Sequence, residues 1–536
     1  MRRKHLRIIV CLLLTALALP LPPGGAEAVE VLPVGQAAAS GFADTEGHWA
    51  WAYIELARQK GLVDGVSPTR FAPDEPLTRA AFLTLLYNCA GSPDAGPAGP
   101  DGDGGTVCGA YFSDVPEGAW YERTAVWALE TGLLEDADTG LFRPDDPATR
   151  EQMCAWLATF AGIMGHALTP VREETVFADD ADIAGWARER VYLLQQSGIV
   201  SGLGDGNFAP KKGLTRAEAA AALIGYLRAV GQLRPRENIV DPCQDIGYEQ
   251  LTAYLRELAV SYPWLIRLDS AGTSFEGRDI PLVRFGRGSR YLYTQANAHA
   301  REHQTANFLL EVLDEYAWAY ENGGTYDGYD VRALLDRYTI VMLPRVNPDG
   351  AEIAQKGFDA AADPAAVKRM SGAYKGAARW KANAEGTDIN RNFPCFWSPL
   401  GNGPAGEGYS GPSAVSAPET RAVLSAMGMF PYAAFLDIHM AGNVIYFCNT
   451  GIDAGYYDRC LTYAKKLCAV TGYKIAWSES IRKDQTAMAY ARYTYRVPAV
   501  TVEITKSIVY PHDSALFDSE IWAFARDLFL EAMTIS

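Results

Sequence analysis

The chain has few cysteines, few histidines and few long apolar runs, and it has fewer basic than acidic residues. None of its nine cysteines belongs to a Cys-x-x-Cys pair, so the sequence predicts neither a zinc ribbon nor a dense disulfide scaffold. After residue 28 no apolar stretch is long enough to span a bilayer. The 48 Lys and Arg residues face 64 Asp and Glu residues, which disfavours non-specific binding to nucleic acid.

The first 28 residues have the pattern of an export signal. A basic start, MRRKHLR, precedes the apolar run IIVCLLLTALALPL and small residues that end in AEA at Ala26–Ala28. A membrane anchor is the alternative, but Pro20, Pro22 and Pro23 interrupt the apolar run too early for one. Removal of residues 1–28 leaves 44 basic and 63 acidic residues, a formal charge of −19. We therefore predict a secreted, acidic mature protein.

One pattern occurs three times in the N-terminal half, starting at Phe42, Phe112 and Phe177. Each copy reads Phe-x-Asp, a tryptophan before an apolar-periodic helix, Gly-Leu or Gly-Ile, Phe-x-Pro, and Thr-Arg at a second helix. The threonine is expected to cap the second helix, and Glu218 three residues after Thr215 is expected to complete a capping box. The pattern predicts three helix–loop–helix units with capping threonines Thr78, Thr149 and Thr215.

An arginine follows each capping threonine, at Arg79, Arg150 and Arg216. A cation gains nothing from the dipole at a helix start. The recurrence of an arginine at this position in all three copies therefore indicates that it contacts a partner or forms a buried ion pair, rather than being a solvated side chain. Copies one and two are separated by Gly91–Thr106, whose Gly- and Pro-rich composition is typical of a flexible linker.

Residues 42–230 resemble a tandem of three S-layer homology modules, at 42–91, 111–162 and 176–230. The module's helix start Thr-Arg-Ala-Glu is complete in the third copy and reads TRAA and TREQ in the first and second. The resemblance implies all-α modules that anchor the chain to a secondary polymer of the bacterial cell wall. It also implies that the helix-start arginines contact this anionic polymer: Arg79, Arg150 and Arg216.

From Tyr248 onward, short apolar runs alternate with helical patterns. YLYTQA, YTIVMLP, AAFLDIH and AVTVEI are typical of buried strands. TANFLLEVLDEYAWAY, APETRAVLSAMGMF and YYDRCLTYAKKLCAVTG are typical of helices. The alternation predicts an α/β domain with a mixed central sheet, in which functional groups gather beyond the strand ends.

Polar residues occur at these predicted strand ends. His299 and Glu302 follow one strand, His439 ends another, and Glu503 lies within the apolar segment TVEI. A lone His-x-x-Glu is usually a polar loop that caps a helix, and a buried glutamate can belong to a structural ion pair. The alternative is a catalytic centre, because two imidazoles, one carboxylate and an open position suit one zinc ion per chain. His303 is expected to point away from such an ion.

Six motifs resemble those of the zinc metallocarboxypeptidases and occur in the family's order. They are GTSFEGRDIPLVRFG (272–286), HARE (299–302), RVNPDG (345–350), WKANAEGTDINRNFP (380–394), DIHMAGNVIYF (437–447) and PAVTVEI (498–504). The resemblance covers about residues 246–536. It implies that His299, Glu302 and His439 hold zinc and that Glu503 is the general base.

The same resemblance implies the substrate-binding residues. Arg301 corresponds to an arginine of the substrate cleft, and Asn390 and Arg391 correspond to the pair that binds the substrate's terminal carboxylate. Lys381 stands nine residues before Asn390, where the family has its oxyanion-stabilising arginine. A lysine there keeps the positive charge and loses the planar fork of the guanidinium.

The segment 478–496 departs from the family pattern, because it lacks the Asp-Trp pair that accompanies the family's mobile tyrosine. Tyr490 and Tyr493 are the candidates for that role. The floor of the family's specificity pocket belongs to the same segment. The preference for a terminal residue therefore stays open.

Together, the two halves predict a secreted, wall-anchored zinc carboxypeptidase that acts on a peptide, with the peptidoglycan stem as the nearest substrate. The WKAN…NRNFP stretch resembles bacterial members that hydrolyse the γ-D-glutamyl bond to a diamino acid. An extracellular nutritional carboxypeptidase is the first alternative. An inactive wall-bound structural protein is the second, and the intact ligand set argues against it. A related zinc deacylase is disfavoured by the intact pair Asn390 and Arg391.

Overall fold

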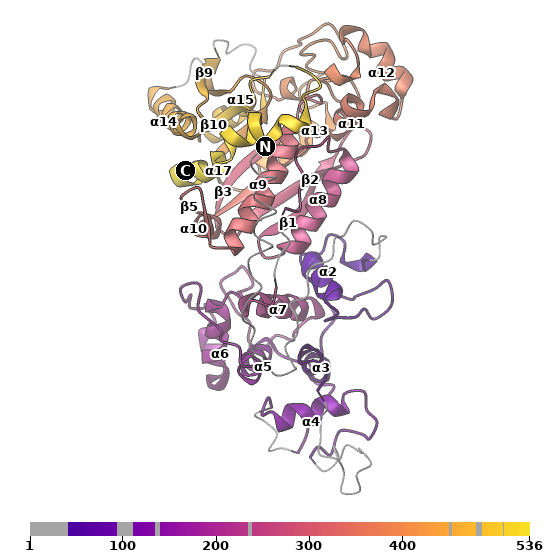
Figure 1. Cartoon of the computed structure of the whole chain (residues 1–536), viewed down its shortest axis with the longest axis vertical. Helices are drawn as coiled ribbons and strands as arrows, with labels where there is room; N and C mark the ends of the chain where they lie inside the picture. The colour runs from indigo at the N-terminus through magenta and orange to yellow at the C-terminus, as the bar shows by residue number, and fades with distance from the viewer. Residues whose placement is uncertain are drawn as a thin grey trace, which may run out of the picture.

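The chain forms an elongated molecule in which the helical N-terminal half lies at one end of the α/β C-terminal half (Figure 1). The computed structural model describes residues 41–93, 111–134, 140–233, 238–449, 453–478, 485–507 and 509–536. The predicted export signal, most of the predicted linker and part of the segment 478–496 lie outside these ranges. The predicted order, all-α modules and then an α/β domain with a mixed sheet, is confirmed.

Each N-terminal module contains the two predicted helices. They are α2 (Trp51–Gln59) and α3 (Arg79–Cys89), α4 (Glu122–Glu130) and α5 (Arg150–Ile163), and α6 (Gly185–Gln196) and α7 (Arg216–Ala229). Thr78, Thr149 and Thr215 each accept the backbone N–H three residues on, as predicted. The capping box of Thr215 with Glu218 is confirmed, and Gln152 completes a second box with Thr149.

The aspartate of each Phe-x-Asp motif holds the Phe-x-Pro loop of the same module. Asp44 accepts the N–H groups of Phe71 at 2.8 Å and Ala72 at 2.7 Å. Asp114 and Asp179 accept the equivalent pairs in the second and third modules. The second residue of each loop has a left-handed backbone, which is unfavourable outside glycine, so the paired hydrogen bonds stabilise a strained turn at Ala72, Arg143 and Ala209.

The three modules close into a ring. The first helix of each module packs on the second helix of the preceding one: α2 on α7, α4 on α3, and α6 on α5. At the centre, Leu77 donates its N–H to Leu214, Leu214 donates to Ala148, and Ala148 donates to Leu77, at 2.7–2.9 Å. Each module therefore satisfies backbone groups of its neighbours.

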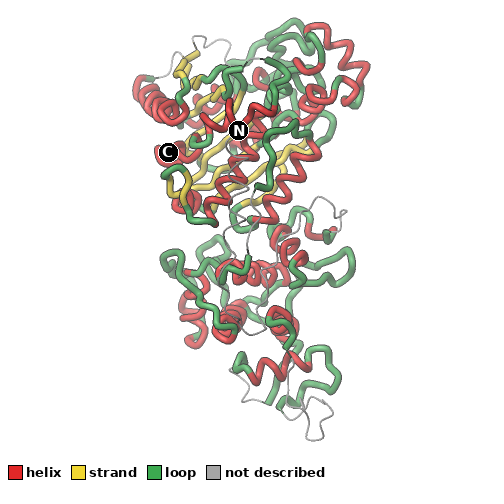
Figure 2. Tube along the Cα trace, in the orientation of Figure 1, coloured by secondary structure: helices red, strands yellow, loops and turns green. Residues whose placement is uncertain are grey.

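The C-terminal half is built on one eight-stranded sheet (Figure 2). Its central strands β6, β3, β7 and β10 are mutually parallel, and the pairs β1–β2, β2–β6 and β10–β8 are antiparallel. In spatial order the strands are β1 (Ile266–Thr273), β2 (Asp279–Gly286), β6 (Tyr338–Leu343), β3 (Arg290–Ala296), β7 (Tyr432–His439), β10 (Ala499–Glu503), β8 (Val444–Asn449) and β9 (Lys474–Ser478).

Helices cover both faces of this sheet because alternate strand residues are apolar on opposite sides. Leu292 and Ala296 of β3 pack in the core with α8 (Tyr248–Ser261), α9 (Gln304–Glu321), α14 (Ala454–Thr471) and α17 (Leu528–Ile535). Tyr293 faces the opposite core, with α13 (Pro418–Met427) and α15 (Ala487–Tyr495). The shorter elements include α10 (Val331–Arg337), α11 (Pro348–Lys356), α12 (Pro364–Met370), α16 (Ala523–Ala525), η10 (Ile389–Arg391) and the hairpin β4 (Thr325–Tyr326) and β5 (Tyr329–Asp330).

A largely buried ion pair joins the two halves. Arg228 of α7 donates to both carboxylate oxygens of Glu321 on α9, with Nη2 2.8 Å from Oε1. The Arg228 guanidinium lies 4.7 Å from the centre of the Trp264 ring, and the Trp264 indole N–H also donates to Glu321. The contact combines charge, hydrogen bonds and stacking.

Among the described helices, none has the length and hydrophobicity needed to cross a membrane.

Candidate metal centre and active site

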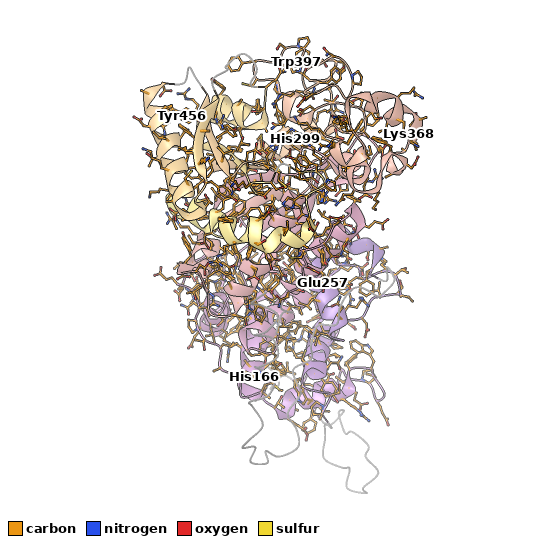
Figure 3. All side chains as sticks on the ribbon, turned by 45° about the horizontal axis from the view of Figure 1, so that its top comes forward. His166, Glu257, His299, Lys368, Trp397 and Tyr456 are labelled. Carbon is orange, nitrogen blue, oxygen red and sulfur yellow. The ribbon has the colours of Figure 1, made fainter. Side chains whose placement is uncertain are left out.

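Three neighbouring parallel strands deliver polar side chains to the same edge of the sheet. His299 and Glu302 follow β3, His439 ends β7, and Glu503 ends β10 opposite His439 in the register. The donor atoms of His299, Glu302 and His439 lie within 4.8 Å of one another, and all three residues are buried. Figure 3 shows His299 inside the C-terminal half, remote from His166 of the helical modules. The structure thus brings the predicted ligand set together.

Both histidines turn the same ring nitrogen toward the shared carboxylate. The Nδ1 atoms of His299 and His439 lie 2.8 and 2.9 Å from the two oxygens of Glu302. Their Nε2 atoms face other carboxylates, Asp388 at 3.3 Å and Asp437 at 3.0 Å. A carboxylate at Nε2 orients each imidazole and leaves Nδ1 to bind a metal. Two imidazoles and one carboxylate in this arrangement fit a catalytic zinc ion.

The charge state of the cluster also suits a cation. Burial by itself would raise the pKa of Glu302, but the adjacent His299 and His439 more than offset it and hold that pKa below its usual range. Burial would likewise raise the pKa of Asp388, yet Lys381 and His299 hold it well below its usual range. Both carboxylates are therefore ionised at neutral pH.

Glu503 has the properties of a proton acceptor. Burial raises its pKa to about 7; His439 opposes this rise, and the neighbouring Glu302 and Asp437 add to it. A carboxyl group with a pKa near neutrality both accepts and returns a proton readily.

The predicted oxyanion-stabilising residue and two of the predicted substrate-binding residues lie beside this cluster. The Lys381 ammonium lies 2.9 Å from the Asp388 carboxylate, which in turn lies 3.3 Å from Nε2 of His299. Asn390 places its amide nitrogen 3.1 Å from His439, and its amide oxygen accepts the N–H of Ala487 at 3.0 Å. Arg391, the next residue, donates to the Asn390 carbonyl at 2.7 Å.

Arg301 lies 4.6 Å above the ring of Tyr510, whose hydroxyl donates to the Met440 carbonyl at 2.9 Å. The Met440 N–H lies 3.2 Å from Glu302. Sequence reasoning did not single out Tyr510. Its only sequence signal is its place seven residues after Glu503.

The tyrosine candidates lie on α15, beside residues 479–484, which fall outside the described ranges. Tyr490 faces Phe393 and Tyr493 contacts Phe396, with ring centres 6.4 and 4.8 Å apart. His303, expected to point away from the ligands, has its Nε2 3.4 Å from Asp245.

The structure places the helix-start arginines between successive modules. Their Nε atoms donate to carbonyls of the neighbouring Phe-x-Pro loops, from Arg79 to Phe142, from Arg150 to Phe208 and from Arg216 to Phe71. Arg150 also forms a buried ion pair with Glu218 at 3.0 Å. Arg79 lines a groove of about 390 Å³ together with Trp156 and Trp186.

Residues 251–502 match the family model described as zinc carboxypeptidase, and residues 41–83, 111–154 and 176–220 each match the S-layer homology domain. The C-terminal half of the chain belongs to the zinc carboxypeptidase family. These matches confirm the predicted resemblance to zinc carboxypeptidases and to S-layer homology modules, the predicted hydrolase class, and the prediction of zinc as the family's metal. The S-layer homology domains indicate association with the bacterial cell surface.

Individual proteins resemble this chain over different lengths. Amylopullulanase of Thermoanaerobacterium thermosulfurigenes is 35% identical over 196 residues, which is 36% of this chain and 10% of that protein. Gamma-D-glutamyl-L-diamino acid endopeptidase 1 of Lysinibacillus sphaericus is 27% identical over 311 residues, 54% of this chain and 74% of that protein. The solved structure of carboxypeptidase A from Helicoverpa armigera is 19% identical, covers 66% of this chain and 86% of that chain, and has a TM-score of 0.43.

Proposed function

We propose that this protein is exported, is held at the bacterial cell wall by its S-layer homology domains, and hydrolyses a peptide bond at the C-terminal end of its substrate. The observation that carries the proposal is the convergence of His299, Glu302 and His439 beside Glu503 at three adjacent strand ends. An inactive structural protein would have no need to keep this buried, charged set intact.

The proposed substrate is the peptide stem of peptidoglycan, cut at the bond between γ-D-glutamate and a diamino acid. Wall anchoring places this peptide nearest to the active site. The similarity to an endopeptidase named for that bond, over 54% of this chain, supports the choice. The WKAN…NRNFP stretch at 380–394 supports it too, by the resemblance described above.

Each side chain of the site has a proposed task. Zinc, when bound by His299, Glu302 and His439, supplies a Lewis acid that polarises the scissile carbonyl. The Glu503 carboxylate takes a proton from the attacking water and returns it to the leaving amine. Lys381 places positive charge beside the developing oxyanion.

Substrate positioning is assigned to three further residues. Asn390 and Arg391 bind the free carboxylate at the substrate's C-terminal end, Arg391 through a charge-assisted fork. Arg301, stacked on Tyr510, forms part of the cleft wall.

Wall binding is assigned to the S-layer homology modules. Arg79 contributes directly, because it lines the groove that also contains Trp156 and Trp186. Arg150 and Arg216 contribute by fixing the loops of adjacent modules that shape the equivalent surfaces. The proposed ligand is an anionic secondary polymer of the wall.

The test uses the full-length, zinc-loaded protein beside its Glu503→Gln variant, with a stem peptide and with a panel of ordinary peptides. We expect the wild type to release the diamino acid fragment, and the variant to be about 10²–10⁴-fold slower. Cleavage of ordinary peptides alone would assign the protein to extracellular nutrition. Absence of cleavage of both substrates, with zinc bound, would favour the structural alternative.

A further inference from the structure

A second cavity lies where the first S-layer homology module meets the peptidase domain. Its volume is about 970 Å³, and its walls come from residues 46–53, α8, β1 and β2. Tyr291, at the start of β3, also lines it, whereas His299 follows the far end of that strand. Seven strand residues span roughly 20 Å. The metal ligands do not line the cavity, which runs along β1 and β2 and reaches β3 only at Tyr291.

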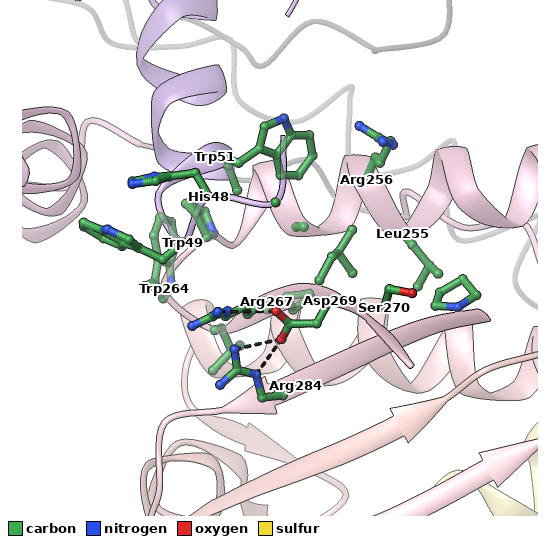
Figure 4. Close-up of a pocket in the computed structure, with 18 of the residues that line it drawn as sticks. His48, Trp49, Trp51, Leu255, Arg256, Trp264, Arg267, Asp269, Ser270 and Arg284 are labelled. Atoms are coloured by element: carbon green, nitrogen blue, oxygen red, sulfur yellow. Dashed lines mark hydrogen bonds and ion pairs between the residues drawn. The ribbon is translucent and has the colours of Figure 1, made fainter. Parts of the chain in front are cut away.

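Three tryptophans line this cavity, two from the module and one from the peptidase domain. They are Trp49, Trp51 and Trp264. Figure 4 shows Trp49 on the same side as Trp264, and Trp51 on the side of Arg256. Trp49 is 46% exposed, so a large part of its indole is presented to solvent. Flat apolar surfaces of this kind stack against the C–H faces of sugar rings.

The polar lining carries excess positive charge, although the whole chain has a net charge of −16. Four arginines, Arg256, Arg267, Arg284 and Arg287, share the cavity with three carboxylates, Glu46, Asp269 and Asp279. Arg267 and Arg284 both pair with the single carboxylate of Asp269, at 3.3 and 2.7 Å (Figure 4). One guanidinium charge at this point is therefore not neutralised by Asp269. Guanidinium groups bind carboxylates and phosphates in a planar fork.

The rim also offers hydrogen-bond acceptors beside these donors. Asp269, Ser270 and Asp279 lie among the arginines in the wall formed by β1 and β2. A sugar ring presents hydroxyl groups that both donate and accept, around two apolar faces. Indole faces, acceptors and guanidinium donors together match this chemistry better than they match a purely apolar ligand.

We propose that this junction cavity binds an anionic glycan segment, whose sugar rings stack on Trp49 and Trp264 and whose acidic group pairs with Arg267 and Arg284. The identification of the glycan as a wall component rests on the proposed function. The binding chemistry itself does not. Because neither the metal ligands nor Glu503 line this cavity, a glycan bound in it leaves the active site open to a peptide.

Two cavity variants and one matched control test the site. Trp49, Trp120 and Trp186 occupy the same place in the three modules, twelve residues before the glycine of the Gly-Leu or Gly-Ile pair. Trp120 is 66% exposed and does not line the junction cavity. Trp49→Ala and Arg267→Gln remove cavity groups, and Trp120→Ala removes a more exposed indole from the equivalent place in the second module.

The first experiment uses the full chain in its Glu503→Gln form, so that hydrolysis plays no part, with an oligogalacturonate hexamer as the carboxylated probe and chitohexaose as the neutral one. We expect the carboxylated probe to protect Trp49 and not Trp120 from hydroxyl-radical oxidation, read by mass spectrometry. In calorimetry, Trp49→Ala and Arg267→Gln should weaken binding at least tenfold, and Trp120→Ala less than twofold. Equal protection of Trp49 and Trp120, or equal affinity for the neutral probe, would overturn the proposal.

The second experiment separates the possible sources of the glycan. Peptidoglycan sacculi stripped of secondary polymer, and the released anionic polymer, are compared as ligands for the wild type and Trp49→Ala. Binding that depends on Trp49 with either source supports the site, and Trp49-independent binding to both contradicts it. Trp49→Ala should cleave a soluble stem peptide at the wild-type rate. A failure of the cavity proposal is thus distinguishable from a failure of the proposed function.

Discussion

Asp314 of α9 is a buried carboxyl group whose Oδ2 accepts the backbone N–H of Val240 at 2.8 Å. Burial raises its pKa from an ordinary 3.8 to about 7. Since the folded-state pKa is the higher one, the folded protein holds a proton that the unfolded chain loses between about pH 4 and 7. The free energy of unfolding therefore falls as the pH rises through this window, by an amount on the order of 2–4 kcal/mol.

Asp314→Asn removes the titrating proton and keeps an oxygen acceptor for Val240. We expect the variant to be more stable than the wild type at pH 8 and to lose less stability between pH 5 and pH 8, measured by urea unfolding. Glu419, whose pKa burial also raises to about 7, should retain part of the pH dependence. Glu249→Gln, at an exposed position of α8, is the control. An unchanged pH profile in Asp314→Asn would refute the assignment.

Lys381 is the residue that we propose to take the place of the family's oxyanion arginine. Its ammonium is paired with Asp388 at 2.9 Å and lies within the field of Glu503. We expect Lys381→Met to lower kcat about 10²–10³-fold while zinc content stays unchanged, because the charge beside the oxyanion is lost. Lys381→Arg should restore most of the activity. A full loss of bound zinc in Lys381→Met, measured by elemental analysis, would instead make Lys381 a positioning residue for Asp388.

At the scale of elements, the Phe-x-Asp aspartates carry a testable share of module stability. Asp179 accepts the N–H groups of Phe208 and Ala209 at 2.7 Å, and Phe208 is fully buried. Asp179→Ala leaves both donors without this acceptor, which should cost about 1–3 kcal/mol of unfolding free energy. Asp182→Ala, an exposed position three residues on, should change stability little. Equal unfolding midpoints for the two variants in calorimetry would show that the loop finds other acceptors.

Sequence patterns predicted the helices and strands well because the interactions that form them join residues close together in the chain. The Thr-x-x-Glu spacing of Thr215 and Glu218 predicted a capping box, since both partners lie within one turn. The apolar run predicted at 433–439 is β7, Tyr432–His439, because strand burial is visible in consecutive residues. The spacing of His299 and Glu302 within HARE likewise needed no knowledge of the sheet order.

Contacts between distant segments could not be predicted. Asp388 and Asp437 orient the two histidines, but only the sheet brings Asp388 from a loop 89 residues after His299 to within 3.3 Å of it. The recurring arginines indicated a partner or a buried ion pair. Only the ring of modules shows that Arg150 binds the Phe208 carbonyl, 58 residues along the chain. Such pairings depend on how elements pack, and packing leaves no periodic trace in the sequence.

At the scale of the whole molecule, the ion pair between Arg228 and Glu321 should make the ring of S-layer homology modules and the peptidase domain unfold together. The two side chains are 16% and 13% exposed, and Trp264 both stacks on Arg228 and donates to Glu321. Arg228→Ala leaves the Glu321 carboxylate largely buried without its cation, which should cost about 3–5 kcal/mol. We expect the Arg228→Ala variant to unfold in two calorimetric transitions and to have a larger radius of gyration in small-angle scattering. Arg123→Ala, at an exposed position of α4, should preserve the wild-type profile. If Arg228→Ala also unfolds in the wild-type manner, the two halves are coupled through other contacts, and the junction cavity does not depend on this pair for its shape.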